Sequence, residues 1–136
     1  MNSSRKSPLM NAILWIFQVG LALLCLSGGA FKVFMFDQVA SEAWYAALPR
    51  GGWGALGVFE MMCGVLLIAP AAVNRMSALT PLAAVALAVE SLSLAALYGR
   101  YSLQLTADNP LVWALLMALL AGIVAVGRYA RWPPTR

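Results

Sequence analysis

Residues 111–127 read LVWALLMALLAGIVAVG, an uninterrupted apolar segment in which no side chain carries a charge. Wound as a helix with about 1.5 Å of rise per residue, this segment covers most of the hydrocarbon core of a bilayer. The sequence Asp108-Asn109-Pro110, directly before it, is typical of a helix start. The segment therefore predicts a membrane-spanning helix.

Three similar apolar segments precede this one along the chain. With it they predict helices at about 12–36, 53–69, 77–98 and 111–128, followed by a tail at 129–136. We expect Pro70 to end the second helix, because proline lacks the amide hydrogen that an interior helical position donates. The predicted fold class is all-α: residues 1–136 form a single integral membrane domain, folded as a four-helix bundle.

The composition excludes several classes of protein. Of the 136 residues, 62% are hydrophobic and 10% are charged, whereas soluble domains carry about 25% charged residues. The net charge of +4 comes from basic residues scattered singly between apolar segments, so no nucleic-acid partner is expected. The chain has no histidine, and its two cysteines are far apart, so we predict no metal site. With no nucleophile motif or phosphate loop either, an independent enzyme is the least favoured class.

Basic residues predict the orientation of the helices, because Lys and Arg are retained on the cytoplasmic side. Six fall on the side of the two termini and three on the other, so both termini are expected in the cytoplasm. The aromatic residues Trp44 and Tyr45 lie in the long connection at 37–52 and favour the lipid headgroups, which predicts a short interfacial helix there. The six basic residues on the side of the termini are Arg5, Lys6, Arg75, Arg128, Arg131 and Arg136; the three on the other side are Lys32, Arg50 and Arg100.

Two carboxylates, Glu60 and Glu90, interrupt the apolar segments. An ionisable group at bilayer depth costs at least about 2.5 kcal/mol, so it needs a counter-ion, a proton or a wet cavity. Helical rise places Lys32 about 6 Å, and the two acids about 10–12 Å, below the outer ends of their helices. We therefore predict that Lys32, Glu60 and Glu90 line a buried polar pocket in the outer half of the membrane.

Residues that share a helix face with these side chains, or lie near the outer end of a helix, are further candidates for this pocket. Gln18 lies on the small, polar face of the first helix and Ser93 on that of the third, while Tyr98 and Arg100 lie near the outer end of the third. Gly57 and Gly64 share the face of Glu60 and predict close approach of another helix. Since one lysine cannot balance two carboxylates, either one Glu holds a proton or Arg50 or Arg100 supplies a second cation. Tyr98 and Trp113 also suit an aromatic ring-binding pocket, although interface anchoring is the simpler interpretation.

The chain resembles the DoxX-like family of small four-helix bacterial membrane proteins over about residues 13–132. The resemblance places this chain in a bacterial inner membrane and includes a Lys at position 32 and a Glu at position 60. This chain departs from the family pattern at two positions: at Tyr98, where relatives often carry a His, and at Glu90, where an apolar residue is expected. The motifs that carry the resemblance are Gly28-Gly29-Ala30-Phe31-Lys32-Val33, Gly57-Val58-Phe59-Glu60, Leu66-Leu67-Ile68, Leu79-Thr80-Pro81-Leu82-Ala83-Ala84 and Val126-Gly127-Arg128-Tyr129.

Three functions remain open at the level of sequence. The resemblance implies an accessory membrane subunit of a redox or quinone-linked complex, with quinone as the candidate cofactor and a membrane or redox protein as partner. The buried acids also suit a small proton-coupled carrier or ligand-binding membrane protein. In the third interpretation the ions only fix helix packing, and the protein is a structural or assembly factor.

Overall fold

The computed structural model describes residues 8–73, 75–76 and 78–131, and these residues are predominantly helical. Four long helices follow one another along the chain: α1 (Pro8–Phe34), α2 (Arg50–Val73), α3 (Leu79–Gly99) and α4 (Pro110–Arg131). Each is long and apolar enough to cross a membrane. The predicted all-α four-helix bundle is confirmed, and the chain is a multi-pass membrane protein.

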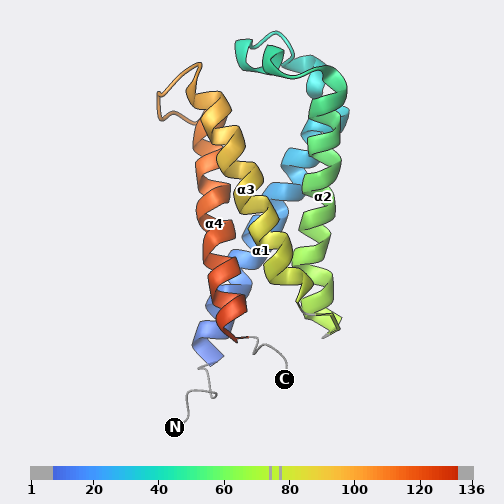
Figure 1. The fold of residues 1–136 in the computed structure, drawn as a ribbon, viewed down its shortest axis with the longest axis vertical. Helices are drawn as coiled ribbons and strands as arrows, with labels where there is room; N and C mark the ends of the chain where they lie inside the picture. Colours follow the sequence, from blue (N-terminus) through green and yellow to red (C-terminus); the bar gives the residue numbers. More distant parts are fainter. Residues whose placement is uncertain (1–7, 74, 77, 132–136) are drawn as a thin grey trace.

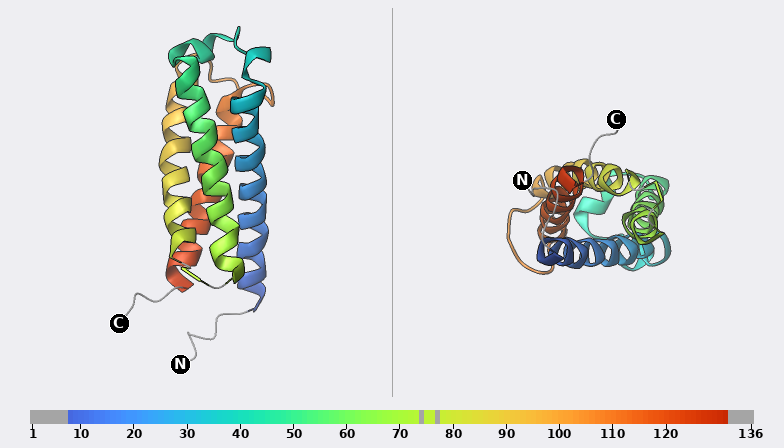
Figure 2. Two further views of the ribbon diagram at one scale, coloured as in Figure 1. Left: turned by 90° about the vertical axis from the view of Figure 1, so that its right-hand side faces the viewer. Right: turned by 90° about the horizontal axis from the view of Figure 1, so that it is seen from below.

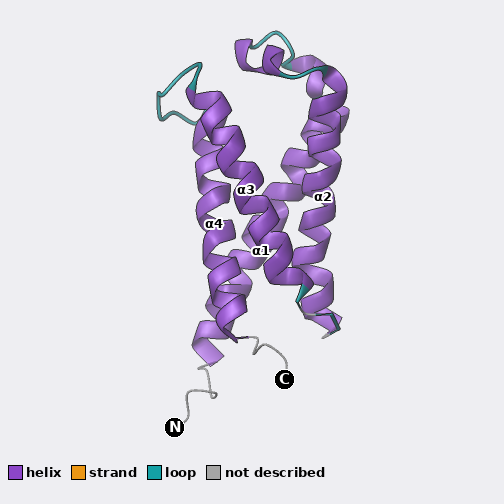
Figure 3. Cartoon of the chain, viewed as in Figure 1, coloured by secondary structure: helices purple, strands orange, loops and turns teal. Residues whose placement is uncertain are grey.

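The helices run alternately up and down and form a four-sided bundle when viewed along its axis (Figures 1 and 2). Helix α1 packs most extensively on α2 and α3 on α4, whereas α1 and α4 share the smallest of the helix–helix contacts. The start of α1, the end of α4 and the α2–α3 connection lie at one end, here called the terminal end. The connections at 35–49 and 100–109 lie at the other, the loop end; Figure 3 draws the second as loop and the first as loop with short helical pieces.

Apolar side chains lie both in the core of the bundle and on its outer surface. Near the terminal end, Leu21, Leu67 and Leu87 are fully buried in a core of aliphatic and small residues. Near the loop end, the core combines the rings of Phe36 and Tyr98 with aliphatic side chains around the fully buried Trp53. Large apolar side chains are also exposed on the outer faces of all four helices, as at Ile16, Val65, Val89 and Leu119. Such continuous apolar surface suits contact with lipid.

Helix α2 does not end before Pro70, as the sequence predicted, but continues through it to Val73. The prediction was wrong because α3 provides the hydrogen bond that the proline cannot make. Pro70 leaves the carbonyl of Leu66 without its helical donor, and the hydroxyl of Thr80 donates to that carbonyl at 3.3 Å. Membrane helices tolerate proline where a neighbouring helix satisfies the freed backbone group in this way.

A second polar contact holds α1, α2 and α4 together near the terminal end. The amide of Gln18, a fully buried side chain, donates to the carbonyl of Leu67 in α2. Arg128 of α4 donates to the Gln18 side-chain oxygen at 2.7 Å and to that of Asn11 at 2.8 Å. The guanidinium also lies 5.4 Å from the centre of the Trp15 ring. Gln18 is thus part of the packing of the terminal half.

The remaining helix bounds differ from the predicted ones by one to four residues. Helix α1 begins at Pro8, since proline is tolerated in the first turn. Helix α4 extends to Arg131, so residues 129–131 belong to the helix rather than to the predicted tail; residues 132–136 lie outside the described part of the chain. Residue 77, the predicted start of the third helix, also lies outside it, and α3 begins at Leu79.

The connection between α1 and α2 contains two short 3-10 helices, η2 (Phe36–Gln38) and η3 (Ala43–Ala47). The sequence predicted one short helix in this region. The ring of Tyr45 packs edge-on against Phe36 and Trp53, with ring centres 5.2 and 5.1 Å apart. The Trp53 indole donates to the carbonyl of Tyr45 at 2.9 Å. These contacts fix η3 against the loop end of the bundle.

Candidate functional site

An ion pair between Lys32 of α1 and Glu60 of α2 lies inside the loop half of the bundle. The lysine nitrogen is 2.9 Å from Oε2 and 3.2 Å from Oε1 of the glutamate. The Glu60 side chain is only 1% exposed and that of Lys32 is 13% exposed. Close approach of Gly29 and Gly57, one turn away on each helix, brings the two backbones near enough for this pair. The pairing agrees with the depths expected from the sequence.

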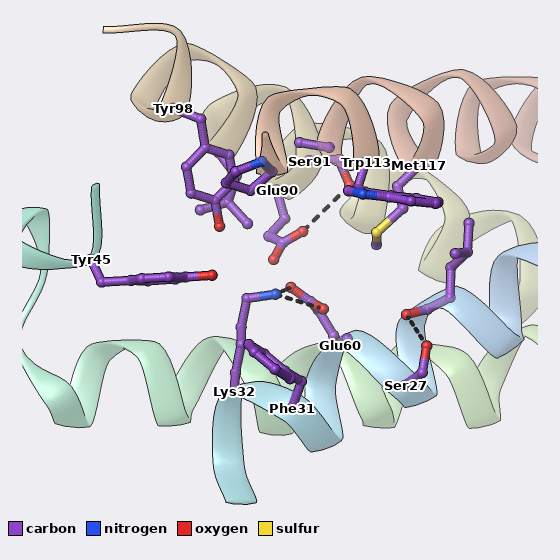
Figure 4. A pocket seen from close by; sticks show the side chains of 15 residues that line it. Ser27, Phe31, Lys32, Tyr45, Glu60, Glu90, Ser91, Tyr98, Trp113 and Met117 are labelled. Atoms are coloured by element: carbon purple, nitrogen blue, oxygen red, sulfur yellow. Dashed lines mark hydrogen bonds and ion pairs between the residues drawn. The ribbon is translucent and has the colours of Figure 1, made fainter. Parts of the chain in front are cut away.

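Glu90 extends from α3 toward the same point, and Figure 4 shows its carboxylate opposite the Lys32 ammonium group and the Glu60 carboxylate. The hydroxyl of Ser91 donates weakly to Glu90 Oε2, at 3.4 Å. The other oxygen, Oε1, is buried, and no donor from the described residues reaches it. Glu90 Oε1 is therefore a buried acceptor without a donor among the described residues, and the Glu90 carboxyl also lies within hydrogen-bonding range of that of Glu60.

A cavity of about 370 Å³ adjoins these three side chains, and all four helices and η3 contribute to its wall. The polar groups gather at one place, while aromatic and aliphatic side chains form the remainder of the lining (Figure 4). This combination of apolar walls with a few convergent polar groups is typical of a site for a small organic molecule. The lining residues are Leu24, Ser27, Gly28, Phe31, Lys32, Tyr45, Glu60, Glu90, Ser91, Leu94, Tyr98, Pro110, Trp113, Ala114 and Met117.

Several hydrogen-bond donors around the cavity are already engaged by the protein. The Trp113 indole donates to the carbonyl of Ala107 at 2.9 Å. The Ser27 hydroxyl donates to the carbonyl of Leu23 at 2.8 Å. The Lys32 ammonium is held by Glu60. These three donors are therefore committed, whereas the acceptor Glu90 Oε1 is not.

Two tyrosines complete the polar part of the wall. Figure 4 shows Tyr45 and Tyr98 pointing from different elements toward the space beside Glu60 and Glu90. Burial raises the pKa of the Tyr45 hydroxyl above its usual value of 10.0, so it is neutral at physiological pH. A neutral phenol can both donate and accept a hydrogen bond. Tyr98 is 4% exposed and stacks on Trp53, which fixes its ring.

The other predicted lining residues differ in whether they reach the cavity. Tyr98 lines the cavity, but Gln18, Ser93 and Arg100 do not. The buried face of α3 passes through Leu87, Ser91, Leu94 and Tyr98. Ser93 lies off this face, is exposed, and donates to the carbonyl of Val89 in its own helix. Arg100 is exposed after the last turn of α3.

Neither arginine proposed as a second cation lines the cavity. Arg50 lies on the loop end, where it pairs with Asp37 at 3.4 Å and covers the Phe36 ring at 4.8 Å. Arg100 points to the surface. Among the residues that line the cavity, Lys32 is the only cation facing the two carboxylates.

Sequence reasoning missed part of the wall. Ser91 was overlooked in favour of Ser93, although the spacing from Leu87 to Tyr98 could have identified it. Trp113, interpreted from the sequence as an interface anchor, and Met117, which the sequence pattern did not single out, share one face of α4 with Pro110 and line the cavity. The aromatic η3 segment gave no sign that Tyr45 turns inward.

Comparison of the sequence with protein-family models finds no match, and no curated protein or solved structure is significantly similar to it. The sequence motifs quoted for the DoxX-like resemblance include Gly29, Lys32, Gly57 and Glu60, which form the α1–α2 crossing and its ion pair.

Proposed function

We propose that this membrane protein binds a small lipid-soluble organic molecule in the cavity of its loop half. The observation that carries the proposal is the cavity itself: about 370 Å³ of space at bilayer depth, apolar over most of its wall and bounded on one side by Lys32, Glu60 and Glu90. A bundle whose buried ions served packing alone would have no need of such a space, because interiors normally pack closely. The cavity thus favours a ligand-binding role over a purely structural one.

The ligand enters from the membrane, between α1 and α4. These two helices share the smallest helix–helix contact in the bundle. In the loop half, Ser27 and Phe31 of α1 face Trp113 and Met117 of α4 across the cavity. Trp113 is 46% exposed on the outer surface of the bundle. An opening at this seam lets a molecule pass from lipid into the site without crossing water.

The orientation inferred from the sequence supports a position for this site in the outer half of a bacterial inner membrane. Arg75 and Arg128 lie at the terminal end, while Asp37, Glu42 and Asp108 lie at the loop end. Retention of basic residues in the cytoplasm then directs the loop end outward. The ligand is accordingly one that is present in, or leaves through, the outer leaflet.

A second candidate is an accessory membrane subunit of a redox or quinone-linked complex, as a DoxX-like relationship implies. The apolar cavity and the inward-pointing Tyr45 and Tyr98 support it, because a quinone head group suits an aromatic wall with hydroxyl groups. Mild-detergent purification distinguishes this role: an oxidoreductase partner and bound quinone should copurify. Their joint absence would contradict it.

Extraction of the protein into nanodiscs with its native lipids, followed by mass spectrometry of bound small molecules, tests the ligand-binding proposal. A β-carbon on Gly28 would lie 3.2 Å from Glu60 Oε1, so Gly28→Leu fills the cavity and should displace the molecule. Gly20→Leu is the matched control on the same helix, because a β-carbon there meets nothing within 4 Å. Equal small-molecule content in both variants and in the unaltered protein would contradict the proposal.

A further inference from the structure

We infer that the ligand of this cavity is an organic cation, a lipid-soluble ammonium compound whose charge is balanced by Glu90. This inference rests on the proposed ligand-binding function and specifies its chemistry. Three independent features of the site support it: the charge balance, the unused acceptor and the arrangement of aromatic rings.

The charge balance leaves one carboxylate without a counter-ion. Lys32 is within 3.2 Å of both oxygens of Glu60, so its charge is committed to that residue. Arg50 is paired with Asp37 outside the cavity. A second ionised carboxylate at this depth would be costly without a cation. When the cavity is empty a proton neutralises Glu90, and when it is occupied the ligand's positive charge takes over that role.

The hydrogen-bonding pattern selects a ligand that brings positive charge or donors. Glu90 Oε1 is buried and reached by no donor from the described residues, whereas the indole of Trp113 and the hydroxyl of Ser27 already donate to backbone carbonyls. A quinone offers acceptors alone, so it accepts a hydrogen bond from the neutral Glu90 carboxyl but leaves the ionised carboxylate unsatisfied. A cation satisfies it directly.

The aromatic rings supply the second attraction that organic cations use. Phe31, Tyr45, Tyr98 and Trp113 come from α1, η3, α3 and α4, and they surround the carboxylates in Figure 4. The negative face of an aromatic ring attracts a desolvated cation, and groups of such rings recognise quaternary ammonium compounds. Leu24, Leu94 and Met117 provide apolar surface for the rest of the molecule.

Binding of the cation is coupled to release of a proton. The protonated Glu90 carboxyl loses its hydrogen ion to solvent as the ammonium group arrives, so the charge of the cavity is unchanged and no bond of the ligand is altered. On α4 the lining residues carry no titratable group. Titratable groups near Glu90 on the other elements are Cys25 and Lys32 of α1, Glu60 and Cys63 of α2, Tyr45 of η3 and Tyr98 of α3.

A pair of isosteric probes tests the inference in nanodiscs of zwitterionic lipid. The probes are 4-phenylbutyltrimethylammonium and the neutral compound in which carbon replaces its nitrogen. After correction for partition into empty nanodiscs, the cation should bind at least about tenfold more tightly than the neutral compound. Because a quaternary ammonium cannot titrate, about one proton released per cation bound at pH 7 must come from the protein.

Variants of single side chains complete the experiment. Glu90→Gln should weaken cation binding by about tenfold or more and abolish proton release, while the matched change Glu42→Gln, at an exposed residue of the 35–49 connection, should alter neither. Trp113→Leu should weaken binding several-fold without unfolding the bundle, because its ring is half exposed. Equal binding of the neutral isostere, or unchanged binding in Glu90→Gln, would overturn the inference.

Failure of this inference and failure of the proposed function give different results. A short-chain quinone that binds more tightly than the cation, or an uncharged molecule identified in the native nanodiscs, would refute the cationic ligand but leave ligand binding intact. If neither probe nor quinone binds and the native extraction contains no molecule dependent on Gly28, both proposals are wrong.

Discussion

Gly29 of α1 and Gly57 of α2 face each other where the two helices are closest. A β-carbon added to Gly29 would lie 2.5 Å from the carbonyl oxygen of Gly57, and one added to Gly57 would lie 2.6 Å from that of Gly29. Real β-carbons do not approach backbone oxygens so closely, so the crossing requires glycine on both helices. It sets the distance between Lys32 and Glu60, one turn further along each helix.

We predict that Gly57→Ala forces α1 and α2 apart and destabilises the bundle. Overpacking at a tight contact typically costs about 1–3 kcal/mol. Gly54→Ala is the control on the same helix, because a β-carbon at Gly54 meets nothing within 4 Å; it should keep or slightly raise the melting temperature. Thermal unfolding in detergent measures both. Equal melting temperatures for the two variants would show that α1 and α2 adapt without cost.

The hydroxyl of Thr80 is predicted to stabilise α2 at its proline. Thr80→Val keeps the shape of the side chain but removes the donor to Leu66, whose carbonyl Pro70 has already deprived of its helical bond. Hydrogen bonds between membrane helices contribute about 0.6–1.7 kcal/mol, and the melting temperature should fall accordingly. Thr106→Val, at an exposed loop position, is the control. No difference between the variants would mean that Leu66 finds another donor.

The sequence predicted the helices well because each apolar segment is long enough to span a membrane. In lipid, a helix is the conformation in which such a segment satisfies its own backbone hydrogen bonds. Its error at Pro70 has an equally physical origin. Whether a proline ends a helix depends on the donors that neighbouring helices offer, and Thr80 lies on a different helix. No pattern within α2 itself contains that information.

The polar part of the site was more predictable than its apolar part. Lys32, Glu60 and Glu90 stand out because charged residues are costly in a membrane. Ser91, Trp113 and Met117 are chemically ordinary, and their place in the wall depends on how far each helix is rotated about its axis. Rotation is set by packing between helices, as Ser93 illustrates: two positions from Ser91, it faces outward.

Raising the pH tests the burial of Tyr45. Because burial raises the pKa of its hydroxyl above 10.0 in the folded protein, the folded state favours the neutral phenol. The resulting stabilisation is complete below pH 10 and is lost as the pH rises through the higher, folded-state value. Between pH 9 and 11 the melting temperature should therefore fall more in the unaltered protein than in Tyr45→Phe. Parallel declines would indicate that Tyr45 titrates as if exposed.

The Lys32–Glu60 pair provides the sharpest test of whether the buried ions serve packing or binding. Lys32→Met leaves Glu60, 1% exposed, without its counter-ion and should cost about 3–5 kcal/mol of stability. Replacing both residues, Lys32→Met with Glu60→Met, removes the unpaired charge as well and should restore most of the lost stability, because buried pairs can often be exchanged for apolar side chains.

Stability and binding should then separate in the double variant. If the pair shapes the polar end of the cavity, the double variant melts near the temperature of the unaltered protein yet binds the cation and the native molecule more weakly, because Glu90 is then the one charged residue left among those that line the cavity. If the pair only fixes helix packing, the same variant keeps both stability and ligand, and the ligand site is then formed by Glu90 and the aromatic rings without the pair. Melting and binding measured on one preparation of each variant distinguish these outcomes, with Glu42→Gln as the control for a change of charge elsewhere.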